Sequence, residues 1–206
     1  MHINVAILGS GGHAKMVIDT LLAANQQACI SVYDDNPCLV GESLLQKFIV
    51  SCAPTDAFTE QYYHIAVGHN KTRALVAGRY AGRDKLFMSI IHPDASVSSF
   101  AVLADGVLVA ANAVIAAEFN VAQGSIINHG AVVDHECEIG EFSHVAPNVT
   151  LGGGVVIGAR SIVGAGAVVL PGIKLGCDVT VGAGAVVTRD INDGQVVKGI
   201  PARCFQ

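Results

Sequence analysis

The sequence contains no tryptophan and few other aromatic residues. Only 5% of its 206 residues are aromatic, although 51% are hydrophobic and 23 are glycine. Globular cores usually take much of their bulk from aromatic side chains. Val, Ile and Ala must fill the core here, which favours a regular architecture of small, repeated cross-section.

Charge is also scarce. Charged residues make up 14% of the chain, and no run of lysine or arginine stands out. With a formal net charge of -5 and a pI of about 5.8, the chain lacks the basic surface that nucleic acids and anionic membranes attract. We therefore expect no nucleic-acid partner. A bound phosphate must be held by backbone amides or by a few local side chains.

Long apolar runs and paired cysteines are missing as well. The segment GVLVAANAVIAA (106–117) lies between Asp105 and Glu118 and is shorter than the ~18 residues of a membrane span. The start, MHINVAILGSGGH, has neither the basic region nor the cleavage site of a signal peptide. Six scattered cysteines without a C-x-x-C pair fit reduced thiols. We expect a cytoplasmic protein without membrane insertion.

An aliphatic residue recurs every six positions through the second half of the chain. The positions are Ile91, Val97, Leu103, Val109, Ile115, Val121, Ile127, Val133, Ile139, Val145, Leu151, Ile157, Val163, Val169, Leu175, Val181 and Val187. A short fixed period is typical of solenoids. Each hexad offers a short strand with its aliphatic residue inward, then a corner where glycine relieves steric conflict. Residues 91–206 are expected to form a parallel β-helix with a C-terminal cap.

The first ninety residues read as alternating strands and helices. The segment NVAILGSGGHAKMVIDTLLAAN predicts a buried strand, a glycine-rich turn and a helix. Further strands are expected in ACISVY, HIAVG and KLFMSII, and a further helix in NKTRALVAGRYAG. The order predicts a Rossmann-like β-α-β-α-β-α-β domain over residues 1–90.

The turn after the first strand matches the dinucleotide-binding fingerprint. The pattern is Gly9-x-Gly11-x-x-Ala14, and Asp34 follows at about the usual ~20-residue distance. Ninety residues are too few for both halves of a dinucleotide fold, so we expect one nucleotide. Amides at the helix start can hold a diphosphate, and Asp34 or Asp35 can accept hydrogen bonds from ribose or sugar hydroxyls. A tight turn without a ligand is the alternative.

Histidines and carboxylates gather in VVDHECEIGEFSHV, residues 132–145. The aliphatic residues Val133, Ile139 and Val145 of this stretch stay in phase with the hexads. The polar residues therefore occupy only positions that the repeat leaves free, and they do not interrupt the fold.

The motifs GSGGH, YDD, IAVGHN and HECEIGEFSH, on a small nucleotide-binding domain followed by hexads, resemble the NeuD-like nucleotide-sugar acetyltransferases. The likeness is greatest to the UDP-4-amino-sugar N-acetyltransferases of bacillosamine biosynthesis. The resemblance implies a left-handed triangular β-helix with three hexads per coil. It also implies acetyl-CoA as cosubstrate, no metal, a nucleotide-sugar substrate, and a homotrimer with active sites between subunits.

The resemblance further implies roles for individual residues. His135 would be the general base, and Glu136 would raise its basicity. Acetyl-CoA would be bound by His144, Gly153, Ala165 and Ala183, and the nucleotide-sugar by Gly11, Gly12, His13, Asp34, Asp35 and Gly68.

Acetyl transfer explains these residue types. An ammonium group has no lone pair, so a base must take a proton from the amine, and histidine with its pKa of ~6.5 works near neutral pH. A neighbouring carboxylate strengthens that base. A turn amide near Gly152 or Gly153 is a candidate donor to the developing oxyanion.

Two geometric conditions follow. Adjacent strand residues point to opposite faces, so His135 and Glu136 can pair only at a corner, and Asp134 is the alternative partner. His135 and His144 are nine residues apart, or one and a half hexads. They lie on different sides of one prism and can meet only across a subunit boundary.

Other functions stay open at this point. Three histidines, His129, His135 and His144, could hold zinc between subunits and hydrate carbon dioxide. The chain could be a nucleotide-sugar binding module without catalysis. Within the acetyltransferases, the acceptor could be a GDP-linked amino sugar, or a hydroxyl group of a sugar such as sialic acid.

Overall fold

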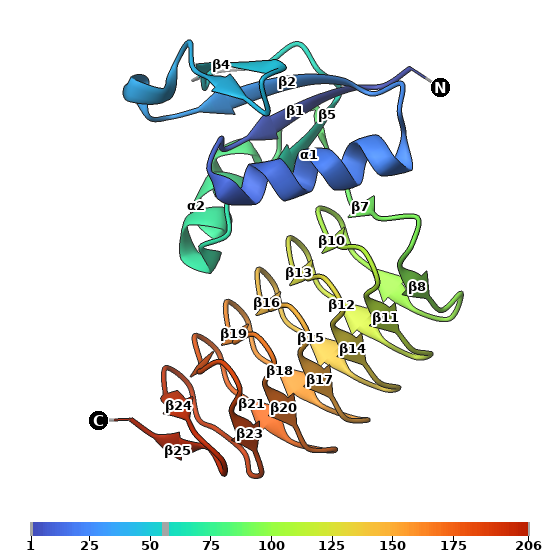
Figure 1. Cartoon of the computed structure of the whole chain (residues 1–206), viewed down its shortest axis with the longest axis vertical. Coiled ribbons are helices and arrows are strands. Elements are labelled where there is room, and N and C mark those ends of the chain that lie inside the picture. Colours follow the sequence, from blue (N-terminus) through green and yellow to red (C-terminus); the bar gives the residue numbers. More distant parts are fainter. Residues whose placement is uncertain (1, 55–57, 206) are drawn as a thin grey trace.

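The computed structural model describes residues 2–54 and 58–205. An α/β domain lies at one end of a long parallel β-helix, and the coils of the β-helix continue from it toward the C-terminus (Figure 1). Neither helix in the described residues is long and apolar enough to cross a bilayer.

The N-terminal domain is built on a six-stranded sheet of order β3-β4-β2-β1-β5-β6. Every neighbouring pair is parallel except β3 and β4. The elements are β1 (Asn4–Leu8), α1 (Gly12–Ala24), β2 (Cys29–Asp34), a 3-10 turn (Pro37–Leu39), β3 (Ser43–Leu44), β4 (Phe48–Cys52), β5 (Tyr62–Ile65), α2 (Asn70–Tyr80) and β6 (Leu86–Phe87).

The predicted β-α-β-α-β-α-β order is wrong in the middle of this domain. No α-helix lies between β2 and β5 in residues 35–54 and 58–61. The antiparallel pair β3 and β4 takes that place, and β4 adds to the sheet beside β2. Pro37 and Gly41 disfavour a helix here, and the FIVSC sequence of β4 carries two β-branched residues that suit a strand.

The β-helix has three sides of short parallel strands. Side 1 consists of β7 (Ile90–Ile91), β10 (Leu108–Val109), β13 (Ile126–Ile127), β16 (His144–Val145), β19 (Ile162–Val163), β22 (Thr180–Val181) and β24 (Val196–Lys198). Side 2 consists of β8 (Ser96–Val97), β11 (Val114–Ile115), β14 (Val132–Val133), β17 (Thr150–Leu151), β20 (Val168–Val169) and β23 (Val186–Val187). Side 3 consists of β9 (Val102–Leu103), β12 (Asn120–Val121), β15 (Glu138–Ile139), β18 (Val156–Ile157) and β21 (Lys174–Leu175).

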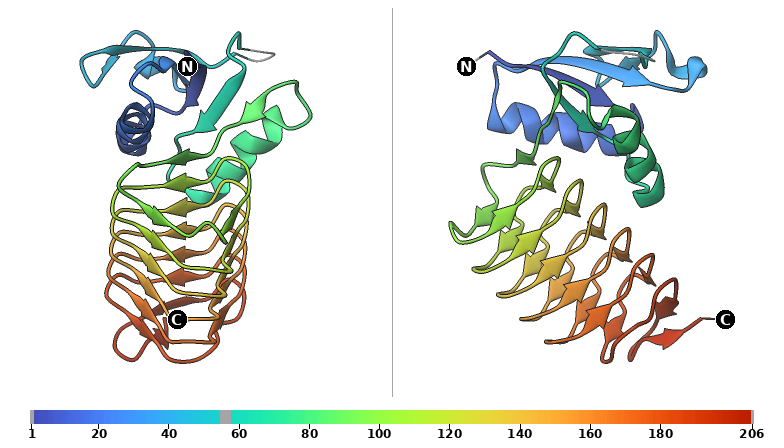
Figure 2. Two further views of the ribbon diagram at one scale, coloured as in Figure 1. Left: turned by 90° about the vertical axis from the view of Figure 1, so that its right-hand side faces the viewer. Right: turned by 180° about the vertical axis from the view of Figure 1, so that it is seen from behind.

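The six-residue period is confirmed strand by strand. Each predicted aliphatic residue is the second residue of one of the strands β7 to β23, and from Val109 onward all of them are buried inside the prism. The coils stack closely, as Figure 2 shows. A Cβ built on Gly158 would lie 2.4 Å from the carbonyl carbon of Gly176 on the next coil. Glycine at this corner therefore permits a backbone approach that a side chain would block.

Helix α1 lies on side 1 of the β-helix. Its buried residues Val17 and Leu21 share one core with Ile90, Leu108 and Ile126, the first residues of three strands on side 1. These first residues point out of the prism, because successive strand residues alternate in direction. The N-terminal domain is thus held on side 1 by apolar packing.

Arg73 of α2 adds a polar connection to the same interface. It is only 1% exposed, and its hydrogen-bond partners in the described part of the chain include no carboxylate. Its guanidinium donates, over 2.7 to 3.2 Å, to the carbonyl groups of Val67, Gly68, Gly124, Phe142 and Ser143 and to Asn70 Oδ1. One side chain therefore joins the loop after β5 to two coils of the β-helix.

The β-helix ends in a different kind of pairing. Strand β24 continues side 1, and β25 (Arg203–Cys204) pairs with it in the antiparallel direction. The chain therefore leaves the six-residue period in an antiparallel hairpin at its C-terminal end.

Candidate active site

His135 and Glu136 form the turn between β14 and β15, at the corner where side 2 meets side 3. Glu136 has φ 59, in the left-handed region, so the chain turns sharply between the two residues. His135 Nδ1 lies 3.0 Å from Glu136 Oε2. Asp134 Oδ1 instead accepts a hydrogen bond from the backbone N–H of His135, at 2.8 Å. Glu136 is therefore the carboxylate that faces the imidazole, and Asp134 fixes the backbone.

Gly153 lies beside His135 on the next coil. A Cβ built on Gly153 would be 2.6 Å from His135 Cε1 and 2.7 Å from Nε2. The backbone N–H of Gly154 donates to the carbonyl of His135 at 2.9 Å, which stacks the two corners. Within the described residues, nothing accepts a hydrogen bond from the Gly153 N–H. The residue that packs against the imidazole therefore has a backbone N–H without an acceptor among the described residues.

His144 is in a different part of the molecule. It is the first residue of β16 on side 1 and faces the N-terminal domain, where its ring centroid is 6.3 Å from that of His13. Burial and the nearby Arg73 lower the pKa of His144 to about 4. Burial and the neighbouring His144 lower the pKa of His13 to about 3. Both imidazoles are therefore neutral at physiological pH.

The carboxyl ends of β1 and β2 border a cavity of about 150 Å³ lined by Tyr33, Asp34, Asp35, Arg79 and Tyr80, among others. Asp35 forms an ion pair with Arg79 at its rim. In open α/β sheets, ligands bind at the carboxyl ends of the strands.

Asp34 also shapes the glycine-rich turn. Its Oδ2 accepts from the N–H of Ser10 at 2.7 Å and from Ser10 Oγ at 2.8 Å, and its Oδ1 accepts from the N–H of Asn36 at 2.9 Å. The expected partner of a ribose hydroxyl is therefore already engaged with the turn that follows β1.

The other predicted substrate residues gather near the start of α1. Gly11 is the N-cap residue of α1, and Gly12 and His13 begin the helix. A Cβ on Gly68 would contact His13 Cβ at 3.7 Å, so the two loops touch. Gly68 lies outside the cavity that holds Asp34 and Asp35, and it lines a second cavity of about 310 Å³.

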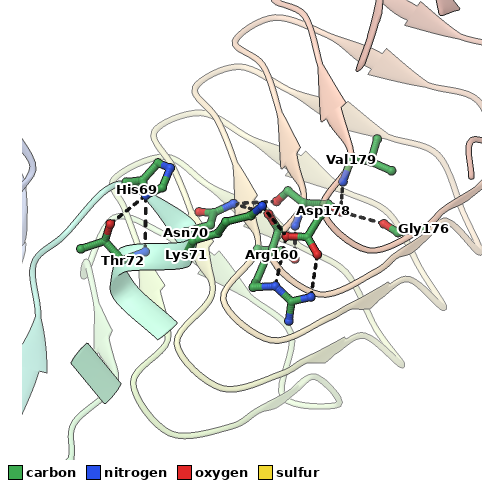
Figure 3. A network of polar contacts seen from close by, with 10 residues as sticks. His69, Asn70, Lys71, Thr72, Arg160, Gly176, Asp178 and Val179 are labelled. Carbon is green, nitrogen blue, oxygen red and sulfur yellow. Dashed lines mark hydrogen bonds and ion pairs between the residues drawn. The ribbon is translucent and has the colours of Figure 1, made fainter. Parts of the chain in front are cut away.

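That second cavity is bordered by an ionic network at the N-terminus of α2 (Figure 3). Arg160 Nη2 lies 2.6 Å from Asp178 Oδ2, and Lys71 Nζ lies 3.5 Å from Asp178 Oδ1. The hydrogen bond from Arg160 lowers the pKa of the Asp178 carboxyl. Asn70 donates to the carbonyls of Arg160 and Ser161, both at 3.0 Å. The network joins α2 to the β-helix.

The predicted acetyl-CoA residues divide into two places. Ala165 and Ala183 are exposed and stack at the corner between side 1 and side 2, where the N–H of Gly184 donates to the carbonyl of Ala165. His144 lies on the adjoining side 1. Gly153 lies at the other corner, beside His135. One chain therefore does not bring all four residues together.

The structure adds two residues that the sequence reading missed, Arg73 and Asn128. Asn128 Nδ2 lies 3.0 Å from His144 Nε2. No motif marks either residue, because their partners are distant in sequence and most of those of Arg73 are backbone carbonyls. In the described part of the chain, no group of three His, Cys, Asp or Glu side chains is placed to hold a metal.

Comparison with known families and proteins gives a consistent relationship. The PglD N-terminal domain family matches residues 4–80. UDP-N-acetylbacillosamine N-acetyltransferase of Bacillus subtilis (strain 168) is 36% identical over 116 residues. That match covers 52% of this chain and 51% of the relative, so it spans about half of each protein.

Solved structures match over nearly the whole chain. A mutant of GDP-perosamine N-acetyl transferase from Caulobacter crescentus, in complex with CoA and GDP-perosamine, has a TM-score of 0.91 at 34% identity and covers 98% of this chain and 97% of that one. The acetyltransferase domain of PglB from Neisseria gonorrhoeae FA1090 has a TM-score of 0.92 at 33% identity, covering 98% and 99%. The same domain in complex with acetyl coenzyme A has a TM-score of 0.89.

These matches confirm the predicted fold, a Rossmann-like domain followed by a left-handed parallel β-helix. Together with the domain family and the His135–Glu136 corner, they show that the chain belongs to the NeuD-like hexapeptide-repeat acetyltransferases.

Proposed function

We propose that this protein transfers the acetyl group of acetyl-CoA to the 4-amino group of a UDP-linked amino-deoxy sugar of the bacillosamine type. The observation that carries the proposal is the exposed corner where Glu136 faces the imidazole of His135, 3.0 Å away. Two similar proteins are named as N-acetyltransferases of sugars, UDP-N-acetylbacillosamine N-acetyltransferase and GDP-perosamine N-acetyl transferase.

His135 serves as the general base. Because Glu136 faces Nδ1, that nitrogen carries the proton and Nε2 keeps the lone pair. The amine nitrogen attacks the thioester carbonyl, and its proton passes to His135 Nε2. When the tetrahedral intermediate collapses, the C–S bond breaks, and the imidazolium returns the proton to the departing thiolate of CoA. The amide product and free CoA result, and no metal takes part.

The transition state carries negative charge on the thioester oxygen. The N–H of Gly153 can donate to this oxygen because it lies beside the imidazole and is not used by any described residue. Backbone donors of this kind stabilise an oxyanion without moving. Gly153 thus has two roles: it leaves room for His135 and supplies a donor.

The nucleotide-sugar binds to the N-terminal domain. Its diphosphate faces the amides of Gly11, Gly12 and His13 at the start of α1, where the helix dipole favours an anion. The base and ribose lie at the mouth of the cavity bordered by Asp34 and Asp35. The two hydrogen bonds that Ser10 donates to Asp34 hold the glycine-rich turn in the conformation that binds this anion.

The cosubstrate lies along the side of the β-helix. His144, Ala165 and Ala183 follow one side and its corner over successive coils. Two similar solved structures are complexes with CoA or acetyl coenzyme A. The small side chains at positions 165 and 183 are exposed, so the pantetheine chain can lie against this corner.

The complete active site forms between subunits of a homotrimer. His135 lies at the corner between side 2 and side 3, and His144 lies on side 1, which does not adjoin that corner. A second subunit is therefore needed to bring the two histidines together. The outward residues of side 2 support an interface, because Val114 and Val132 are 39% and 40% exposed. Closed rotational symmetry then gives three equal sites.

A GDP-linked amino sugar is the second candidate, because a similar structure of 34% identity is a complex with GDP-perosamine. Acetylation of a sugar hydroxyl, as in sialic acid, is the third. The test is release of free thiol from acetyl-CoA with matched UDP-, GDP- and CMP-sugars, each with and without an amino group. Turnover confined to an amino sugar supports N-acetylation, and turnover of the hydroxyl sugars alone overturns it.

A further inference from the structure

His144 continues a column of outward side chains on side 1. The three residues before it in this column, Ile90, Leu108 and Ile126, are apolar and at most 1% exposed, because α1 covers them. His144 occupies the next place, where the covering domain meets the β-helix. A polar ring in such a position needs a partner, since an unpaired buried polar group is costly by roughly 1–3 kcal/mol.

Asn128 supplies that partner, and its orientation is fixed. Its Oδ1 accepts a hydrogen bond from the N–H of His129 at 2.8 Å. The amide nitrogen Nδ2 must therefore point the other way, where it lies 3.0 Å from His144 Nε2. The backbone of Asn128 is held as well, because its N–H donates to the carbonyl of Val145 at 2.9 Å.

This orientation determines the tautomer of His144. An amide NH₂ group only donates, so His144 Nε2 must accept and carries no proton. The proton of the neutral ring is then on Nδ1. Within the described residues, His144 Nδ1 has no hydrogen-bond partner, so its N–H is free to donate to a bound molecule.

The surroundings keep the ring neutral. The titratable groups that contact the ring or act on its charge are His13 of the N-terminal domain and the buried guanidinium of Arg73. Neither is an anion, so no negative charge among the described residues stabilises an imidazolium here. Desolvation by burial is the main cause and the positive charge of Arg73 is the second, and together they lower the pKa of His144 to about 4.

We propose that Asn128 is a positioning residue that holds His144 as the Nδ1–H tautomer, so that His144 donates one hydrogen bond to a carbonyl oxygen of acetyl-CoA. The hydrogen bond to acetyl-CoA rests on the proposed function, whereas the tautomer of His144 does not. A neutral donor binds the carbonyl oxygen without transferring its own proton. His135 therefore remains the group that accepts the proton of the amine.

The first experiment tests the tautomer without using activity. The protein is labelled with ¹⁵N-histidine, and long-range ¹⁵N–¹H correlation spectra are recorded at pH 7.5, with His144→Gln to assign the signals. We expect a protonated, pyrrole-like Nδ1 and an unprotonated, pyridine-like Nε2. A protonated Nε2 in the wild-type protein overturns the proposal whatever the enzyme does.

The second experiment replaces Asn128→Asp. The carboxylate accepts where the amide donated, so it draws the proton to His144 Nε2 and favours the imidazolium. We expect the Kd for acetyl-CoA, measured by calorimetry at pH 8.5, to rise about tenfold, the loss of one hydrogen bond. At lower pH, where the ring carries both protons, the Kd should recover. An unchanged Kd at both pH values overturns the donor role.

The matched control is Asn120→Asp, which adds the same charge at an exposed position on side 3. Its Kd should stay within twofold of wild type. If Asn128→Asp does not fold, Asn128→Ala removes the donor without adding a charge, and its Kd should rise by about threefold or more. Absence of acetyl transfer with every sugar would defeat the proposed function alone, because the spectra and the Kd are measured without turnover.

Discussion

The imidazole of His135 packs directly on Gly153 of the next coil, so closely that a Cβ at position 153 would lie 2.6 Å from Cε1. A contact below 3.0 Å forces one of the two groups to move, and Gly153 is not in the left-handed region, so backbone strain is not the reason for this glycine. The glycine is required by the position of the imidazole.

Gly153→Ala should therefore remove activity while the protein stays folded. The new methyl group displaces the imidazole from Glu136, and we expect kcat to fall by about 10²-fold, the size of a general-base contribution. Thiol release and thermal unfolding measure the two effects. Gly78→Ala, on α2, is the control and should keep full activity, because no described residue lies within 4 Å of the added Cβ. Normal turnover in Gly153→Ala would show that catalysis does not depend on the position of the His135 imidazole.

The two members of the corner pair should differ in their effects. His135→Ala removes the base, so kcat should fall by ~10²-fold or more while binding of the nucleotide-sugar is kept. Glu136→Gln keeps the shape but loses the charge, so its loss should be smaller, about tenfold. Steady-state rates and calorimetric titration of the nucleotide-sugar check both. An equal loss of substrate binding in His135→Ala would contradict its assignment as the base.

Arg73→Met should loosen the joint between the two domains. The substitution leaves the buried carbonyls of Gly124 and Phe142 and the partly buried carbonyl of Gly68 without their donor. We expect the free energy of unfolding to fall by about 3 kcal/mol or more, and the melting temperature by roughly 10 °C. Arg79→Met, which removes only an exposed ion pair with Asp35, should cost less than about 1 kcal/mol. Equal melting temperatures for the two variants would refute this role of Arg73.

The β-helix was predictable because its core repeats at a fixed period. Val109, Ile127 and Val145 each fill the same place in successive coils, so the period in the sequence directly gives the position of each residue in the β-helix. The corner of His135 and Glu136 was predictable for the same reason: the hexad defines where a strand ends. The pair of β3 and β4 was not, because the segment between β2 and β5 has no period and its strands are short.

The domain interface could not be read from the sequence. Arg73 lies in a helix of mixed polarity, where a single arginine usually faces solvent. Most of its partners are backbone carbonyls, which exist at every residue and leave no mark in a sequence. Asn128 and His144 are 16 residues apart, and only the stacking of the coils makes them neighbours. The residues that connect the two domains therefore became visible only in three dimensions.

Stability should fall in mild acid because the interface buries neutral histidines. The folded-state pKa values of His64 and His144 are about 4, and that of His13 about 3, mainly through burial. In the unfolded state these histidines bind protons below pH ~6.5, whereas in the folded protein they stay neutral until the pH reaches their lower folded-state pKa. The unfolded state thus gains protons as the pH falls below 6.5. Each histidine therefore lowers the free energy of unfolding by about 1.4 kcal/mol per pH unit, down to its folded-state pKa. Above pH 7 the effect is absent.

Urea denaturation at pH 7.5, 6.5, 5.5 and 5.0 measures this slope. His64→Gln keeps a donor for the carbonyl of Met88, which His64 Nδ1 contacts at 2.8 Å, and should reduce the slope by about one proton. His129→Gln, at an exposed position, is the control and should leave the slope unchanged. A flat free energy from pH 7.5 to 5.0 in the wild-type protein would show that these histidines are protonated in the folded state.

Subunit mixing should show whether each active site uses two chains. If His135 of one subunit works with His144 of the next, a trimer that mixes His135→Ala and His144→Ala chains contains one site with both histidines intact. Random mixing at equal amounts makes about three quarters of the trimers mixed, so about a quarter of the sites regain both histidines. With acetyl-CoA well below its Kd, where His135→Ala is inactive and His144→Ala works about tenfold more slowly, the mixture should reach about a quarter of the wild-type activity. A site within one chain would give no recovery, because every chain lacks one histidine. Mixing His135→Ala with His135→Asn is the matched control. It must stay inactive, since no arrangement of those subunits restores the base, and the contrast between the two mixtures then reports the shared site and not refolding.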